Sequence, residues 1–99
     1  MENKTLTELT EELKSKKISS SELTKHYLEK IKKYDPKLNS FITLTEEFAL
    51  TKASQIDTEI SKGNFKPLSG IPIAQKDIFC TKGVRTTCGS KMLSNFISP

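Results

Sequence analysis

The chain has 99 residues and a net charge of +4, and 34% of its residues are hydrophobic. So low a hydrophobic fraction favours one small domain, or part of a larger protein, over an independent domain with a sizeable core. The basic residues are spread along the chain, without the clustering and interleaved aromatic residues of a nucleic-acid-binding patch. The absence of a long apolar run excludes a signal peptide or membrane span, so the expected location is the cytoplasm, or an organelle matrix.

Two capping boxes mark the starts of the first two expected helices. Thr5 and Glu8 have the S/T-x-x-E spacing of the first box, and Ser19 and Glu22 repeat it. The capping role accounts for Ser19 and argues against a catalytic cluster in the serine run 19–21. Apolar side chains follow each box at helical intervals. They are Leu6, Leu9 and Leu13 in the first helix, and Leu23, Tyr27, Leu28, Ile31 and Tyr34 in the second.

The ends of these helices and the third helix follow from local signals. The first helix should fade near residues 16–17, and the dipeptide Asp35-Pro36 should stop the second. Residues 39–44 are typical of a short strand or an extended linker. A third helix then begins at Thr43 or Thr45, and Gly63 occupies the position of a C-terminal glycine cap. Its apolar face consists of Ala49, Ala53, Ile56 and Ile60, with Phe48 beside it.

Composition changes after Gly63, where helix signals stop. Residues 71–79 form a candidate strand, followed by a loop over 81–90. Side chains alternate along a strand, so Lys76 and Asp77 should point to opposite faces and should not pair with each other. The expected fold class is α/β, with three helices in a helical part 5–62 and two short strands, the second inside a strand-and-loop part 67–99 that carries Lys76.

Lys76 is the candidate catalytic residue, because a basic side chain at the end of an apolar strand is costly to bury. A lysine can replace histidine as the base that activates a serine nucleophile. It must be neutral to do so, and burial can bring the pKa of a lysine from about 10.4 toward about 7. The alternative is a lysine that reaches solvent or pairs with a carboxylate elsewhere.

The sequences GIPIAQKD (70–77) and TKGVRTTCGSKM (81–92) resemble the amidase signature family, and the likeness extends over essentially the whole chain. Within the family they are most similar to the branch formed by the A subunits of Glu-tRNA(Gln) amidotransferases. The resemblance implies helices flanking a mixed central sheet and a catalytic set of two serines with Lys76. The chain has no two consecutive glycines, so the Gly/Ser-rich stretch with those serines is expected beyond Pro99. The chain should then be an inactive N-terminal fragment, residues 1–99 of a longer domain.

The resemblance also implies partners. The B and C subunits would complete a heterotrimer that takes ammonia from glutamine and uses ATP to convert Glu-tRNA(Gln) to Gln-tRNA(Gln). No cofactor or metal is expected on this chain itself, because its cysteines, Cys80 and Cys88, lack the spacing of a zinc site and are interpreted as free thiols.

Three other interpretations stay open. One is a fragment of another amidase-signature hydrolase that acts on a small amide without tRNA. A second is a non-catalytic helical interaction module that is complete at 99 residues. A cysteine nucleophile paired with His26 would be a further class of enzyme, but His26 falls inside the second helix and no orienting acid is evident.

Overall fold

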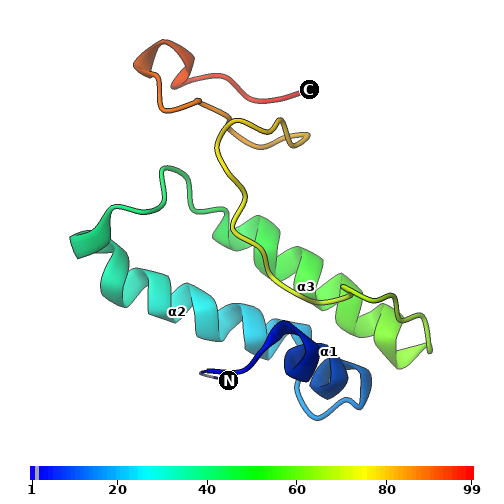
Figure 1. The fold of residues 1–99 in the computed structure, drawn as a ribbon. Helices are drawn as coiled ribbons and strands as arrows, with labels where there is room; N and C mark the ends of the chain where they lie inside the picture. Colours follow the sequence, from blue (N-terminus) through cyan, green and yellow to red (C-terminus); the bar gives the residue numbers. More distant parts are fainter. Residues whose placement is uncertain (2) are drawn as a thin grey trace.

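The computed structural model describes residues 1 and 3–99, which form three α-helices and one short 3₁₀ helix (Figure 1). The helices are α1 (Leu6–Lys14), α2 (Ser20–Leu38), α3 (Glu46–Ser61) and η1 (Lys91–Leu93). Helices α2 and α3 pack against each other, and α1 lies by the N-terminal end of α2. After α3 the chain runs back along that helix and ends in a segment of turns, drawn from yellow to red in Figure 1.

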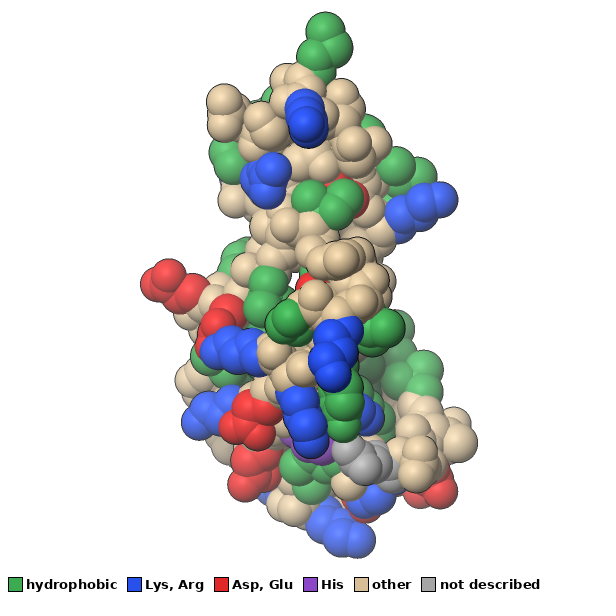
Figure 2. Space-filling view, turned by 90° about the vertical axis from the view of Figure 1, so that its left-hand side faces the viewer, with side chains coloured by type: hydrophobic (Ala, Val, Ile, Leu, Met, Phe, Trp, Pro, Cys, Tyr) green, Lys and Arg blue, Asp and Glu red, His purple; other side chains and the backbone are tan. Residues whose placement is uncertain are grey.

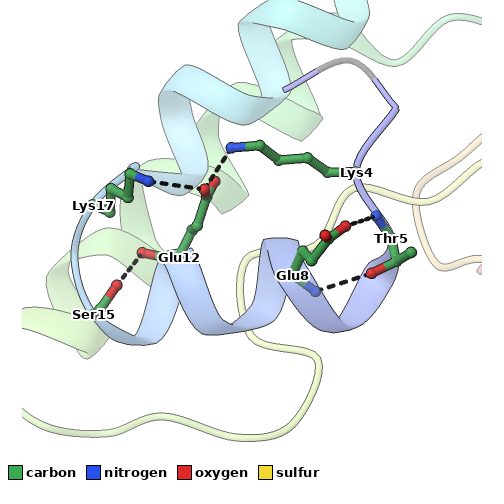
Figure 3. Close-up of polar contacts among 6 residues, drawn as sticks. All are labelled: Lys4, Thr5, Glu8, Glu12, Ser15 and Lys17. Carbon is green, nitrogen blue, oxygen red and sulfur yellow. Dashed lines mark hydrogen bonds and ion pairs between the residues drawn. The ribbon is translucent and has the colours of Figure 1, made fainter.

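Both predicted capping boxes are confirmed. The Thr5 hydroxyl accepts a hydrogen bond from the backbone N–H of Glu8 (3.2 Å), and the Glu8 carboxylate accepts one from the N–H of Thr5 (2.6 Å; Figure 3). Ser19 and Glu22 make the same reciprocal pair at α2. A cap of this kind contributes about 1 kcal/mol, so local sequence fixes where these helices begin.

The predicted glycine cap of α3 is also confirmed. Gly63 has a left-handed backbone, with φ of 85°. Its N–H donates to the carbonyl of Ile60 (3.0 Å), and the N–H of Asn64 donates to the carbonyl of Glu59 (2.9 Å). This pair of bonds is the Schellman arrangement, which satisfies the carbonyls left open at a helix end.

The predicted end of α2 at Asp35-Pro36 is wrong. The helix continues through Pro36 to Leu38 and ends at Asn39, whose φ of 53° is left-handed. Proline in the last turn removes only one hydrogen bond. The neighbouring groups offset that loss, because the N–H of Asn39 donates to the Asp35 carbonyl (2.7 Å) and the N–H of Ser40 donates to the Asp35 carboxylate (2.6 Å).

The core is small and lies mainly between the helices. Leu9 and Leu13 of α1 meet Leu23 of α2, and partly buried neighbours surround this cluster; they are Met1, Ile18, Tyr27, Phe65 and Ile71. Leu28, Ala53 and Ile60 are also buried on α2 and α3. The predicted apolar faces are therefore confirmed at most of their positions, whereas Leu6, Tyr34 and Phe48 are exposed.

The two predicted strands do not form: the prediction for 71–79 is wrong, and residues 39–44 take the predicted alternative, a linker. The described part of the chain contains no β-strand, so neither 39–44 nor 71–79 supports the expected α/β sheet. A strand needs a partner for its backbone N–H and carbonyl groups, and residues 71–76 run extended without one. The nearest approach to a sheet is an isolated antiparallel bridge between Arg85 and Ile97. Two backbone hydrogen bonds flank it, from Thr86 to Phe96 (3.1 Å) and from Ser98 to Val84 (3.2 Å).

Candidate active site

Lys76 lies at the point where the extended stretch 71–76 turns into a tight loop. The N–H of Phe79 donates to the Lys76 carbonyl (3.2 Å) and closes this turn. The Lys76 side chain is exposed, and so are the apolar side chains of Ile73, Ile78 and Phe79 around it. The burial expected for a lysine in an apolar strand is therefore not provided by residues of this chain.

Asp77 faces Thr87 and not its neighbour Lys76. The N–H of Thr87 donates to Oδ1 of Asp77 (2.9 Å), and the Thr87 hydroxyl donates to Oδ2. The hydroxyl bond and the backbone bond from Thr87 lower the pKa of the Asp77 carboxyl, with smaller contributions from the Gly89 N–H and the Arg85 cation. Asp77 and Lys76 form no ion pair within the described residues, as predicted, but the cause is Thr87 and not strand alternation.

Residues 87–90 form a tight turn, named here the 87–90 turn. The N–H of Ser90 donates to the Thr87 carbonyl (2.8 Å). The two central residues, Cys88 and Gly89, both have positive φ, 52° and 70°, as in a type I′ turn. The N–H of Cys88 donates to the backbone carbonyl of Asp77 (2.8 Å), so the turn is fastened to the residue next to Lys76.

The rest of the C-terminal segment supports this arrangement. Nε of Arg85 donates to the Ser94 carbonyl (2.6 Å), and its Nη1 donates to the Thr43 hydroxyl (3.4 Å), which links the segment to the connection before α3. The amide of Gln75 donates to the Thr81 hydroxyl (2.7 Å). Figure 2 shows most of the acidic side chains over the helical part, mixed with basic ones, whereas the C-terminal segment at the top carries basic and apolar side chains with little acid.

The serine run of α2 is structural, as predicted for Ser19. An aspartate of α3 holds the other two serines, and no local sequence pattern reveals this contact. The Asp57 carboxylate accepts hydrogen bonds from the N–H of Ser20 (2.6 Å), the N–H of Ser21 (3.0 Å) and the Ser21 hydroxyl (2.6 Å). A carboxylate at a helix N-terminus also interacts favourably with the helix dipole.

The remaining candidate residues do not converge. Cys80 and Cys88 are free, exposed thiols, and His26 lies within α2 beside the ring of Tyr27. No group of three His, Cys, Asp or Glu side chains that could hold a metal ion occurs in the described part of the chain. None of the described helices has the length and hydropathy needed to cross a membrane.

Comparison with known proteins gives the family. The Amidase family model matches residues 22–99, which include α2 except its first two residues, all of α3 and residues 70–92, named here the Lys76 segment. The chain therefore belongs to the amidase family, and the resemblance seen in GIPIAQKD and TKGVRTTCGSKM is confirmed.

Similar individual proteins share one name, that of the A subunit of glutamyl-tRNA(Gln) amidotransferase. The chain is 59% identical to that of Coxiella burnetii (strain Dugway 5J108-111), 58% to that of Methylococcus capsulatus and 54% to that of Saccharophagus degradans. Each match covers all 99 residues of the chain and 20% of the relative. The chain thus spans about a fifth of the length of these relatives.

Proposed function

We propose that this chain is the N-terminal part of the glutamine-hydrolysing subunit of a Glu-tRNA(Gln) amidotransferase, and that Lys76 carries protons in its active site. One observation supports this most directly: the identity of 54–59% to proteins of that name runs through the full chain, including the Lys76 segment. The family match alone would also allow an amidase that acts on another amide.

In the proposed reaction a serine hydroxyl attacks the side-chain amide of glutamine. The hydroxyl proton passes through a second serine to the Lys76 amine and from there to the leaving ammonia; water then releases glutamate from the acyl-enzyme. Lys76 must be neutral for this, and burial favours the neutral form of a lysine. The exposed Ile73, Ile78 and Phe79 give the apolar surroundings that such burial needs once further residues cover them.

The whole enzyme would have two further subunits. Ammonia would pass to the B subunit, which uses ATP to amidate Glu-tRNA(Gln), and the C subunit would complete the heterotrimer. This chain would bind neither ATP nor another cofactor. The enzyme would work in the cytoplasm, where it supplies Gln-tRNA(Gln) for protein synthesis.

Residues 1–99 alone should be inactive. Their serines include no pair within a Gly/Ser-rich stretch; Ser19 caps α2, and Ser20 and Ser21 donate hydrogen bonds to Asp57. Without a nucleophile and oxyanion donors the main catalytic contributions are missing.

The test is ammonia release from glutamine by the protein that contains this chain with its native continuation, assembled with the B and C subunits and given ATP and Glu-tRNA(Gln). Lys76→Ala should lower kcat by about 100-fold or more, the range typical of a proton-transfer group. Lys82→Ala removes another exposed lysine nearby and is the matched control. Equal activity of Lys76→Ala and Lys82→Ala would refute the role of Lys76, and glutamine hydrolysis indifferent to Glu-tRNA and to the partners would favour a different amidase.

A further inference from the structure

The backbone that carries Lys76 is tied to another part of this chain directly after the lysine. The fixed point is the next residue, Asp77, which binds the 87–90 turn through its main chain and its side chain.

We propose that Asp77 and Thr87 are positioning residues for Lys76, a proposal that rests on the catalytic role proposed above. The Asp77 carboxylate fastens the 87–90 turn to the backbone beside Lys76 and so fixes where the lysine amine lies. Neither residue is proposed to touch substrate.

Hydrogen bonds connect Asp77 to the 87–90 turn at several points. Thr87 gives both its N–H and its hydroxyl to the two carboxylate oxygens of Asp77, and its hydroxyl oxygen in turn accepts the N–H of Gly89 (3.1 Å). The N–H of Cys88 donates to the Asp77 carbonyl (2.8 Å). Thr87 is 2% exposed and Asp77 is partly buried, so the Thr87 side of these bonds is shielded from water.

The turn itself needs such an anchor. Cys88 has φ of 52°, a left-handed conformation that costs a residue with a side chain about 1 kcal/mol or more. Backbone of this kind persists only where surrounding contacts determine it. The hydrogen bonds to Asp77 hold Cys88 in this conformation, and they keep the strained turn next to the backbone of Lys76.

The position of a catalytic group matters to within less than an ångström. A displacement of about 1 Å can cost about 100-fold in rate. Loss of the Asp77 carboxylate should therefore reduce kcat while substrate binding, which other residues govern, changes little. The lowered pKa of Asp77 agrees with these contacts, because the hydrogen bonds from Thr87 favour the charged carboxylate.

The experiment measures kcat and KM for glutamine in the assembled enzyme that contains the full-length form of this chain. Asp77→Ala and Thr87→Val remove the two halves of the contact, whereas Thr87→Ser keeps the hydroxyl. Asp57→Ala is the matched control. Asp57 lies on α3 and accepts three hydrogen bonds from Ser20 and Ser21 at the start of α2, so its loss removes a hydrogen-bonded aspartate that does not contact the 87–90 turn. Thermal unfolding of each variant reports its stability.

We expect kcat to fall about 10- to 100-fold in Asp77→Ala and Thr87→Val with KM changed less than about threefold, and Thr87→Ser to restore at least half of the activity. Asp57→Ala should lower the unfolding temperature. At temperatures below this lowered value its kcat should stay close to that of the unmodified enzyme. The proposal is overturned if Asp57→Ala and Asp77→Ala lose kcat in the same proportion to their loss of thermal stability. It is also overturned if kcat of Thr87→Ser is no higher than that of Thr87→Val. Full activity of Asp77→Ala together with an inactive Lys76→Ala overturns this proposal alone, whereas full activity of Lys76→Ala overturns the proposed function.

Discussion

At the scale of single residues, Gly70 brings the chain before Lys76 into close contact with the helical part. Its φ is 81°, and a Cβ placed on it would lie 3.0 Å from Cβ of Ser20 and 3.2 Å from Oγ of Ser20. The Ser20 hydroxyl donates to the Gly70 carbonyl (3.0 Å). This contact joins the beginning of the Lys76 segment to the N-terminus of α2.

Gly70→Ala should therefore destabilise the fold for two reasons. The left-handed backbone alone costs alanine about 1 kcal/mol, and the contact with Ser20 adds about 1–2 kcal/mol of overpacking. The measurement is the free energy of unfolding in urea. Gly83→Ala is the control, because Gly83 has a similar φ of 75° and open space around it. Equal losses in the two variants would show that the approach to Ser20 carries no energy.

At the scale of secondary-structure elements, α1 and α3 end in the same way with different residues. At α1 the left-handed position is Lys16, with φ of 61°. Its N–H donates to the Leu13 carbonyl (3.1 Å), and the N–H of Lys17 donates to the Glu12 carbonyl (2.9 Å). The Schellman hydrogen bonds thus form without the glycine that usually permits them.

Lys16→Gly should stabilise the chain. Glycine adopts the left-handed conformation without a side-chain penalty, and the relief exceeds the added freedom of the unfolded chain by about 0.5–1 kcal/mol. Lys14→Gly, two residues earlier in the last turn of α1, should instead cost about 1 kcal/mol. Chemical denaturation of both variants tests this, and a loss of stability in Lys16→Gly would contradict the assignment of strain to that residue.

The sequence predicts the helix starts well because their signals are local. Thr5 with Glu8, and Ser19 with Glu22, each contain both partners of the cap within four residues. The Asp57 contact with the serines of α2 spans more than thirty residues, and no local pattern announces it. The prediction of a strand at 71–79 is wrong for the same reason. A strand forms only with a hydrogen-bonded partner strand, and local sequence does not identify that partner.

The candidate site likewise has features that local sequence predicts and features that depend on residues distant in the sequence. The motif around Lys76 predicts a catalytic lysine at this position, a role that stays a prediction, and the apolar neighbours in the sequence do not predict the exposure of its side chain. The sequence analysis does not predict the contact between Asp77 and Thr87. Gly89 indicates a turn within residues 86–89, about ten residues after Asp77, but not what that turn contacts. Knowing that both oxygens of Asp77 are used by Thr87 requires the fold of the loop.

At the scale of the whole molecule, the charges near α1 and the C-terminal segment together set the response to acid. Hydrogen bonding from Lys4 lowers the pKa of Glu12, with an added contribution from Lys17, and the backbone N–H of Thr5 lowers the pKa of Glu8 (Figure 3). Thr87 does the same for Asp77. All three carboxylates are thus more acidic in the folded chain than in the unfolded one.

This direction fixes the sign of the pH dependence. A carboxyl group with a lowered pKa in the fold stabilises it fully above its unfolded pKa of about 4, and that stability is lost as the pH falls through the lowered value. The contribution of these carboxylates to the free energy of unfolding should therefore be flat between about pH 6 and 7 and should decrease steadily below about pH 4.5. Urea unfolding followed by circular dichroism at a series of pH values measures it.

Glu12→Gln separates one contribution from the rest. The variant keeps the size of the side chain but loses the ion pairs with Lys4 and Lys17, so it should be less stable than the unmodified chain at pH 7. The difference should shrink as the pH falls, because protonated Glu12 resembles glutamine, and the two curves should converge once the pH is below the lowered pKa of Glu12. A gap that persists at low pH would mean that Glu12 acts through packing, and a chain that gains stability on acidification would contradict the lowered pKa values themselves.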